Sequence, residues 1–470
     1  MNKLSICLLI FFIPLFAQAQ IVNSYEINAE FFPKDAQMYN YPVSSESFMR
    51  ANSTIQLSEI KDSIVTFYLH GETKIDSIRS GGNNINYDYE KVLYNYDYSR
   101  VALKVIVNSS DLVDENLTVF YSGFFNPSKA GALSNYMHIN NSSGVYLRGY
   151  GYSLWFPVFV EAGSDSYKSE FRKVIVTLPP GYKCVVGGKL VREKTDSANY
   201  IATWEPGLTD ILDIQCTARK FKLNKKENVY VYYLNDKTSS DKVLDYSIGL
   251  RKLYSQNLKD IEESQPLFIM EMPKYGDISS ANVVGISESI FNNFEEDIRS
   301  KLTIAHELVH PYVKIPVTKE NAFYAFVIEG FPSFFQAYAL KRIEVDKYKL
   351  DEVMRGVEKS YLEKRKTGKT RRGNELPKEK AILKISPEDI GAYKDKFVLN
   401  DRVWLFFYSV WDQMGDKKFD LFLKELFSSK SIDYESFENL VIKYLPGYEK
   451  KLNIWLNTTD YPQQISLTKE

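Results

Sequence analysis

The sequence has little histidine and cysteine, and neither sign of charge predominates. Its 59 basic and 60 acidic residues give a formal net charge of −1. A chain without excess positive charge has no overall field that attracts nucleic acid or an anionic membrane. We therefore expect neither as a partner.

Long hydrophobic runs are also missing. The apolar run Leu4–Phe16 contains Pro14 and is too short to span a hydrocarbon layer of roughly 30 Å. Lys3 precedes it, and Ala17-Gln18-Ala19 follows as a small-x-small cleavage site, which is typical of a secretory signal peptide. We expect residues 1–19 to be removed near Ala19, and the mature chain to be secreted or periplasmic without a stable membrane anchor.

Two cysteines would remain after this cleavage, Cys184 and Cys216. In an oxidising compartment they could form a disulfide. Cys216 also lies on the apolar side of an alternating run with Leu212, Ile214 and Ala218, so two buried thiols explain it equally well. The sequence leaves both alternatives open.

Two of the four histidines lie in the sequence His-Glu-Leu-Val-His at 306–310, and Glu329 follows after 18 further residues. On a helix, His306 and His310 are one turn apart on the same face, while Glu307 is offset and can reach a metal's water. The alternative, two ordinary histidines on a helix surface, requires a coincidence expected roughly a few times in ten thousand such chains.

Two imidazoles and one carboxylate are a common ligand set for catalytic zinc, which keeps its fourth position for water. His306, His310 and Glu329 are therefore the candidate ligands of one zinc ion per chain, and Glu307 is the candidate general base. This constellation predicts a zinc hydrolase that acts on peptides or proteins.

The chain divides by its hydrophobic periodicity. Residues 20–228 contain short β-rich runs, several of which alternate with period two, separated by turns such as Pro179-Pro180-Gly181. This pattern predicts an N-terminal antiparallel β-sandwich domain. Residues 229–470 begin with strand candidates and continue with period 3.6, including helices over Asp297–His310 and Ala325–Val345, which predicts an α+β, mostly helical second domain.

The metal motif and the segment Glu329-Gly330-Phe331 resemble the gluzincin metallopeptidases, most closely the aminopeptidase N (membrane alanyl aminopeptidase) family. Weaker likenesses are the Tyr-Ser-Gly at 121–123 and the Trp-Phe-Pro at 155–157. The resemblance covers about residues 25 to 460. It implies a multidomain chain whose second part is a thermolysin-like catalytic domain, with zinc ligands His306, His310 and Glu329, and Glu307 as general base. The long C-terminal helical array of larger members is missing.

The family also binds the substrate's amino terminus through a Gly-Xaa-Met-Glu-Asn strand and stabilises the oxyanion with a tyrosine. The strand corresponds either to Gly276–Ser280 or to Gly285–Ser289, and only the second contains an acid, Glu288. Tyr393 has the right distance for the tyrosine, whereas alignment of the helix that ends at Gly415 places Asn400 there instead.

Two further departures, Pro311 and Gln336, and one condition on Pro332 concern the helices that carry the candidate ligands. Pro311 should end or kink the metal helix at its second ligand. Pro332 requires its helix to begin near Glu329. Gln336 stands where the family commonly has an acid that orients a ligand, so a neutral amide would take that place.

The resemblance implies an aminopeptidase-like zinc peptidase. An endopeptidase variant remains an alternative because the amine-binding strand is altered. A non-catalytic binding or scaffold protein that kept the fold is a second alternative, and a zinc hydrolase of esters or epoxides is a third. The sequence gives no indication of oligomeric state, and the basic residues from Lys364 to Arg372 fit either a solvated surface or a cleft edge that prefers acidic substrates.

Overall fold

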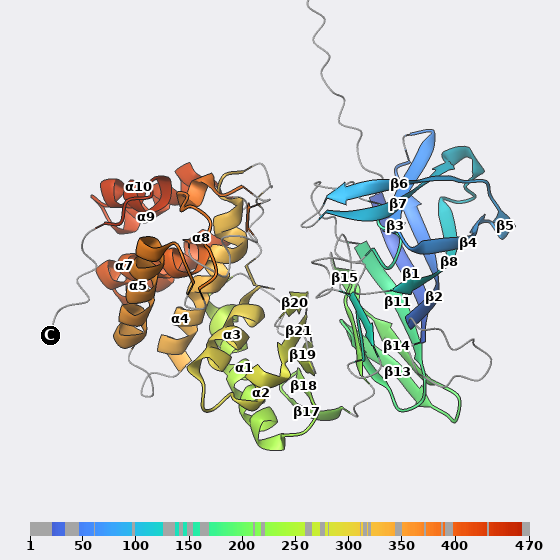
Figure 1. Ribbon diagram of the computed structural model, residues 1–470, viewed down its shortest axis with the longest axis horizontal. Helices are drawn as coiled ribbons and strands as arrows, with labels where there is room; N and C mark the ends of the chain where they lie inside the picture. Colours follow the sequence, from blue (N-terminus) through green and yellow to red (C-terminus); the bar gives the residue numbers. More distant parts are fainter. Residues whose placement is uncertain are drawn as a thin grey trace, which may run out of the picture.

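Figure 1 shows the computed structural model of the chain. The structure describes residues 21–32, 47–60, 62–95, 99–125, 137–140, 144–147, 154–159, 169–209, 212–217, 221–258, 266–272, 278–280, 282–310, 312–313, 317, 321–343, 350–370, 373–386, 389–390, 398–429 and 432–462. The expected signal peptide, Pro311 and Tyr393 lie outside these residues. None of the helices in the described part is long and apolar enough to cross a membrane.

The N-terminal part is a β-sandwich, as the period-two pattern predicted, and its largest sheet has the strand order β13-β14-β11-β1-β2-β8-β4-β5, with β15 attached to β11. These strands are β1 (Ile21–Phe32), β2 (Ser47–Ser58), β4 (Thr73–Ser80), β5 (Asn83–Asn84), β8 (Asn116–Phe125), β11 (Ser169–Leu178), β13 (Lys189–Thr195), β14 (Tyr200–Glu205) and β15 (Gly207–Thr209). The pairing is antiparallel except between β1 and β11, which run parallel.

Two smaller sheets complete this part. One has the order β12-β16-β10-β9 and the other the order β3-β7-β6, with the turn η1 (Ser109–Asp111) after β7. Their strands are β3 (Ile64–His70), β6 (Asp88–Asn95), β7 (Ser99–Asn108), β9 (Met137–Asn140), β10 (Gly144–Leu147), β12 (Lys183–Val186) and β16 (Ile214–Thr217). Cys184 on β12 and Cys216 on β16 are directly opposite one another, and both are buried free thiols.

Alternation along β11 shows how the sequence builds the sandwich core. Phe171 is buried, and burial then resumes at Val174, Val176 and Leu178. The alternation changes phase at Arg172 because β11 has a bulge there, where its pairing with β1 shifts by one residue. The bulge keeps apolar side chains on the core side of both halves of the strand.

A five-stranded sheet with the order β17-β18-β19-β21-β20 lies between the sandwich and the helices (Figure 1). Its strands are β17 (Lys222–Lys226), β18 (Val229–Tyr233), β19 (Leu267–Met272), β20 (Ile278–Ser280) and β21 (Val283–Ser287). The central three strands are parallel, and the edge strands β17 and β20 are antiparallel to their neighbours. β17 thus joins this sheet although it precedes the predicted domain boundary at residue 229.

Every residue of β19 is buried because both faces of this sheet are covered. Phe268 and Met270 belong to the core of the β-sandwich, whereas Leu267 and Ile269 belong to the core of the helical part. Phe268 also meets Trp204 edge to face, with ring centroids 5.8 Å apart. The two parts of the chain are therefore joined by continuous apolar packing through the sheet.

The helical part is mostly α-helical, as the period of 3.6 predicted, and the predicted helix Asp297–His310 is α3. Its elements are α1 (Lys237–Asn257), α2 (Glu288–Asn292), α3 (Ile298–Val309), η4 (Phe326–Gly330), α4 (Phe331–Ile343), α5 (Leu350–Thr367), η5 (Ile382–Lys384), η7 (Val398–Arg402), α7 (Val403–Met414), α8 (Asp416–Ser428), α9 (Tyr434–Tyr444) and α10 (Glu449–Asn457). The side chains of Asp236, Asp297 and Asp433 cap α1, α3 and α9 by accepting backbone N–H bonds. The predicted single helix over Ala325–Val345 is instead a π-helical turn, η4, followed by α4.

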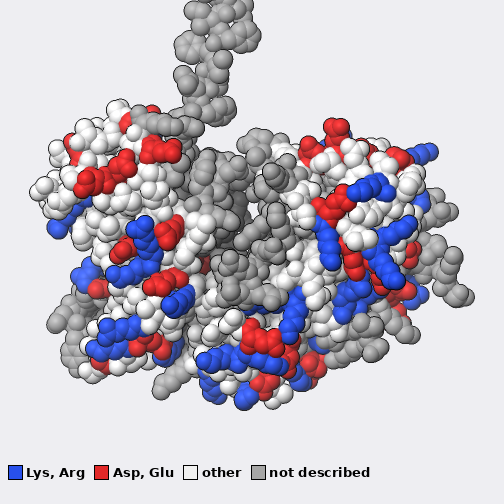
Figure 2. All heavy atoms as spheres, turned by 180° about the vertical axis from the view of Figure 1, so that it is seen from behind, with Lys and Arg blue, Asp and Glu red and all other residues white. Residues whose placement is uncertain are grey.

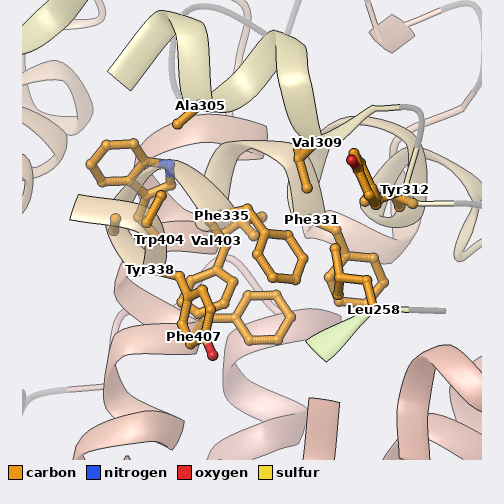
Figure 3. Packing of buried hydrophobic residues seen from close by; sticks show 14 of the residues in the cluster. Leu258, Ala305, Val309, Tyr312, Phe331, Phe335, Tyr338, Val403, Trp404 and Phe407 are labelled. Atoms are coloured by element: carbon orange, nitrogen blue, oxygen red, sulfur yellow. The ribbon is translucent and has the colours of Figure 1, made fainter. Parts of the chain in front are cut away.

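Figure 3 shows how α3, α4 and α7 pack together. Ala305 and Val309 of α3 lie above Phe335 of α4, and Trp404 and Phe407 of α7 fill the space beside it. Phe407 stacks on Phe334 of α4 with ring centroids 4.5 Å apart. Close packing of large aromatic side chains fixes the relative positions of these helices.

Candidate functional site

His306 lies in the last turn of α3, and His310 directly follows the end of that helix. Nε2 of His306 lies 3.1 Å from Nε2 of His310, so the two imine nitrogens point at a common region. α3 ends at Val309, and His310 is its C-terminal flanking residue. The prediction that the metal helix ends at its second ligand is therefore confirmed, while Pro311 itself lies outside the described residues.

The third candidate ligand comes from η4. Glu329 is buried, and its Oε2 atom lies 3.7 Å from Nε2 of His306. Pro332 is not at a helix start, because the helical run begins at Tyr324 and continues through η4 into α4. Its missing N–H falls directly after the π-helical turn. One ligand atom from each of His306, His310 and Glu329 lies within 4.8 Å of the other two.

This geometry fits zinc. Two atoms that are each about 2.0–2.2 Å from one tetrahedral zinc ion are about 3.3–3.6 Å apart. The observed separations of 3.1 Å and 3.7 Å are close to that range. Two imidazoles and one carboxylate leave a fourth tetrahedral position for water or substrate, as in catalytic zinc sites.

Gln336 contacts the far side of the first ligand. Its side-chain amide lies 2.8 Å from Nδ1 of His306. The atom that faces the ring is the amide nitrogen, which can donate to an unprotonated Nδ1. If Nε2 binds a metal, Nδ1 carries the hydrogen, and a 180° turn of the amide would bring its oxygen into place to accept it. The expectation that a neutral amide takes the place of an orienting acid is confirmed by this contact.

Glu307 follows His306 on α3 and is buried, with a relative exposure of 8%. Its position next to the first ligand is fixed by the helix itself. A carboxylate in a buried position beside a metal's open coordination site can accept a proton from water.

α1 supports the metal helix through a tyrosine that the sequence did not single out. The hydroxyl of Tyr254 donates to the carbonyl oxygen of Ala305, 2.9 Å away, in the residue directly before His306. Burial raises the pKa of Tyr254 well above its ordinary value, so the hydroxyl stays a neutral donor. Its only sequence signal was its place on the apolar side of an amphipathic helix.

The two candidate segments for amine recognition take different positions. Glu288 begins α2, and its Oε1 atom accepts a 3.4 Å hydrogen bond from Asn235. Ile278–Ser280, from the first alternative, forms the edge strand β20, which has no acidic residue. Both α2 and β20 pack against α3. Gly276 lies outside the described residues.

Of the two oxyanion candidates, Tyr393 lies outside the described residues. Asn400 lies in η7, which packs against η4, the turn that carries Glu329. Asn400 is partly exposed.

Three of the basic residues from Lys364 onward have acidic neighbours. Lys364 pairs with Asp401, Arg365 with Glu379, and Lys369 with Glu375. Figure 2 shows the same mixing of acidic and basic side chains over one face of the molecule. These pairs favour a compensated surface over a cleft edge that selects acidic substrates.

No protein-family model matches the sequence, and no curated protein sequence matches it. Solved structures do match. An M1 zinc metallopeptidase from Deinococcus radiodurans has 13% sequence identity and a TM-score of 0.64, and the match covers 95% of this chain and 96% of that chain. A variant of that enzyme was solved with the substrate Tyr-Ser-Ala.

Native yeast LTA4 hydrolase matches with 15% identity and a TM-score of 0.63, over 95% of this chain and 69% of that chain. At identities this low, the likeness establishes the fold and its two-part architecture. The predicted fold, a β-sandwich followed by an α+β, mostly helical domain, is thereby confirmed.

Proposed function

This chain has the fold of the M1 zinc metallopeptidases, and from that premise we propose that it is a zinc-dependent peptidase with Glu307 as general base. The observation that carries the proposal is the convergence of three ligand atoms within 4.8 Å beside the buried Glu307. A peptide substrate is supported by the Tyr-Ser-Ala complex of the Deinococcus enzyme.

His306, His310 and Glu329 would hold one zinc ion. Gln336, with its amide oxygen turned toward Nδ1, would keep His306 in the tautomer that presents Nε2. Zinc in such a site acts as a Lewis acid and lowers the pKa of water to about 7. Glu307 would accept a proton from the attacking water and deliver it to the nitrogen of the leaving amine. Its place on the same helix as two ligands fixes the distance of this transfer.

Tyr393 is our proposed donor to the oxyanion of the tetrahedral intermediate, with Asn400 as the alternative. Removing one such donor slows catalysis by about 10²–10³-fold. Substitution of each residue by alanine in separate variants would identify the donor through this loss of kcat.

Cleavage at the amino terminus is our first proposal, with Glu288 as the carboxylate that would pair with the substrate's ammonium group. Endopeptidase activity is the second candidate, and one observation favours it. The edge strand β20 has no acidic side chain, so a chain passing through the site would meet no fixed countercharge there. Loss of amino-terminal cleavage in Glu288→Gln would support the first proposal, and internal cleavage by the wild type would support the second.

We also propose that the mature chain acts outside the cytoplasm. The basis is the sequence of residues 1–19, with its apolar run and small-x-small site. Amino-terminal sequencing of the exported protein should give a start near Gln20, and a start at Met1 would refute the proposal.

A mixed peptide library, analysed by mass spectrometry, tests the activity directly. Hydrolysis should disappear with a chelator, return with zinc, and be lost in Glu307→Gln, which should still bind one zinc ion. Unchanged hydrolysis by Glu307→Gln would remove the mechanism. A chain that binds zinc and cleaves no peptide would instead be the binding or scaffold protein of the alternative prediction.

A further inference from the structure

Arg402 is a charged side chain with no exposed surface, in the last position of the π-helical turn η7. Its guanidinium reaches the end of α10, where Nε donates to the Trp455 carbonyl at 3.0 Å and Nη2 to the Ile454 carbonyl at 2.8 Å. Nη2 also donates to the carbonyls of Thr458 and Asp460. The last carbonyls of a helix lack helical partners and carry partial negative charge, so a buried cation is stabilised there.

An acidic partner completes the surroundings of Arg402. Nη1 lies 3.0 Å from Oε1 of Glu379, a carboxylate that also pairs with Arg365 of α5. Breaking a buried pair by removing one partner leaves an uncompensated charge. The side chain of Arg402 is therefore held rigidly by the C-terminal segment of the chain.

η7 in turn packs against η4, the turn that supplies Glu329. Gly330, directly after this ligand, lies against Val403, directly after Arg402. A Cβ at Gly330 would be 3.3 Å from Cγ1 of Val403. At the other end of η4, the Phe326 ring stacks on Phe407 of α7 with centroids 5.5 Å apart. The residues on both sides of Glu329 thus contact the helix that Arg402 begins.

Both η4 and η7 are π-helical turns, a rare geometry that is found mostly as single turns and often at functional sites. A turn with an extra residue has weaker intrinsic stability than a regular helical turn and depends on its packing. Since η4 and η7 pack on one another, each supports the other's geometry.

We propose that Arg402 is a positioning residue for the third metal ligand: anchored by the C-terminal segment, it holds η7 against η4 and so fixes where Glu329 meets the two histidines. This inference rests on the proposed zinc site and deepens it. Its consequence is that zinc affinity depends on contacts behind Glu329 that touch neither the metal nor the substrate.

Gly330→Ala tests the contact between η4 and Val403, the residue that directly follows η7. The new methyl group would meet Phe326 and Val403 at 3.3 Å, which requires shifts of a few tenths of an ångström beside Glu329. We expect about a 10-fold loss of zinc affinity, similar to other disturbances around metal ligands, with an unchanged melting temperature of the metal-free protein. Zinc affinity is measured by competition with a chromophoric chelator.

Two variants complete this series. Gly330→Ala/Val403→Ala removes the opposing methyl groups and should restore the affinity. Gly356→Ala, in α5, adds a methyl group where no atom lies within 4 Å and should leave the zinc affinity unchanged. Wild-type affinity in Gly330→Ala, or no recovery in the double variant, would overturn the inference.

Arg402→Lys tests the anchor, because lysine keeps the charge but loses the planar fork of donors. Arg365→Lys is the matched control, since Arg365 binds the same Glu379 and donates to the Thr459 carbonyl from α5 instead of η7. Arg402→Lys should lower zinc affinity about 10-fold, and Arg365→Lys should lower only the melting temperature. Equal effects of the two on zinc affinity would refute the role of Arg402.

If Arg402→Lys does not fold, the zinc affinities of the Gly330 variants test the inference. A wild-type chain that binds no zinc would overturn the metal site and this inference together. A wild type that binds zinc, with Gly330→Ala unaffected, would overturn the inference and leave the proposed function intact.

Discussion

The side-chain amide of Gln336 lies 2.8 Å from Nδ1 of His306, on the opposite side of the ring from the nitrogen that faces His310. One side chain of α4 therefore restrains the ring orientation of the first candidate metal ligand. The amide brings no charge, so the basicity of His306 is raised less than a carboxylate would raise it.

Gln336→Glu should bind zinc about 10-fold more tightly than the wild type, because a carboxylate accepts more strongly from the imidazole N–H. Gln336→Leu removes the acceptor and should weaken binding by about 10–100-fold. Chelator competition gives both values. Gln413→Leu is the control, since Gln413 donates to Ser409 within its own helix. Equal zinc affinity of the Leu and Glu variants at position 336 would contradict this role.

Tyr254 gives the protein an alkaline limit. Burial raises its pKa in the folded state above the unfolded value of about 10, so the folded state binds the proton more tightly. Its stabilisation is fully present below about pH 10 and decreases as the pH rises beyond that value. The free energy of unfolding, measured by urea denaturation from pH 7 to pH 11, should fall above pH 10.

Tyr254→Phe should lower the free energy of unfolding by about 1 kcal/mol at pH 7, because the Ala305 carbonyl loses its donor. Above pH 10, the free energy of unfolding of this variant should fall less steeply with pH than that of the wild type. Tyr89→Phe, at an exposed position, controls for the loss of a hydroxyl group. Identical alkaline profiles for the wild type and Tyr254→Phe would show that Tyr254 does not contribute.

Cys184 and Cys216 should form a disulfide when the chain matures in an oxidising compartment. They are direct partners across antiparallel strands, where Cα atoms are about 4.5–5.5 Å apart, within the range that a disulfide requires. Thiol titration in denaturant should give no reactive thiol for exported protein and two for protein made in a reducing cytoplasm. Two thiols in the exported protein would favour the alternative of two buried thiols.

Asn282 joins the β-sandwich to the five-stranded sheet. Its Oδ1 accepts from the backbone N–H of Gly188 at 3.2 Å, and its Nδ2 donates to the Pro266 carbonyl at 2.8 Å. Asn282→Ala leaves both backbone groups without this partner and should lower the free energy of unfolding by about 1–3 kcal/mol.

Urea denaturation measures that change. Asn293→Ala is the control, because Asn293 donates only to the Ser289 carbonyl of its own short helix among the contacts described. An Asn282→Ala variant as stable as Asn293→Ala would show that the junction depends on apolar packing alone.

Local periodicity was sufficient for much of the molecule. Helix α3 (Ile298–Val309) lies within one residue of the predicted helix Asp297–His310 at each end, because its hydrophobic pattern matches one local geometry. His306 and His310 were identifiable as a pair for the same reason, since a spacing of four residues on a helix places two side chains together without any other part of the chain.

Contacts between distant segments were decided by packing. Whether Glu329 meets the histidines depends on the π-turn η4, and the hydrophobic pattern at Ala325–Val345 predicted an ordinary helix there. The support from Arg402 and Tyr254 depends on partners far away in the chain. Ile278–Ser280 became the edge strand, with Glu288 on a helix beside it, through sheet pairing. A linear pattern records which face of an element is apolar, whereas the distance between two such elements follows from how their side chains fit together.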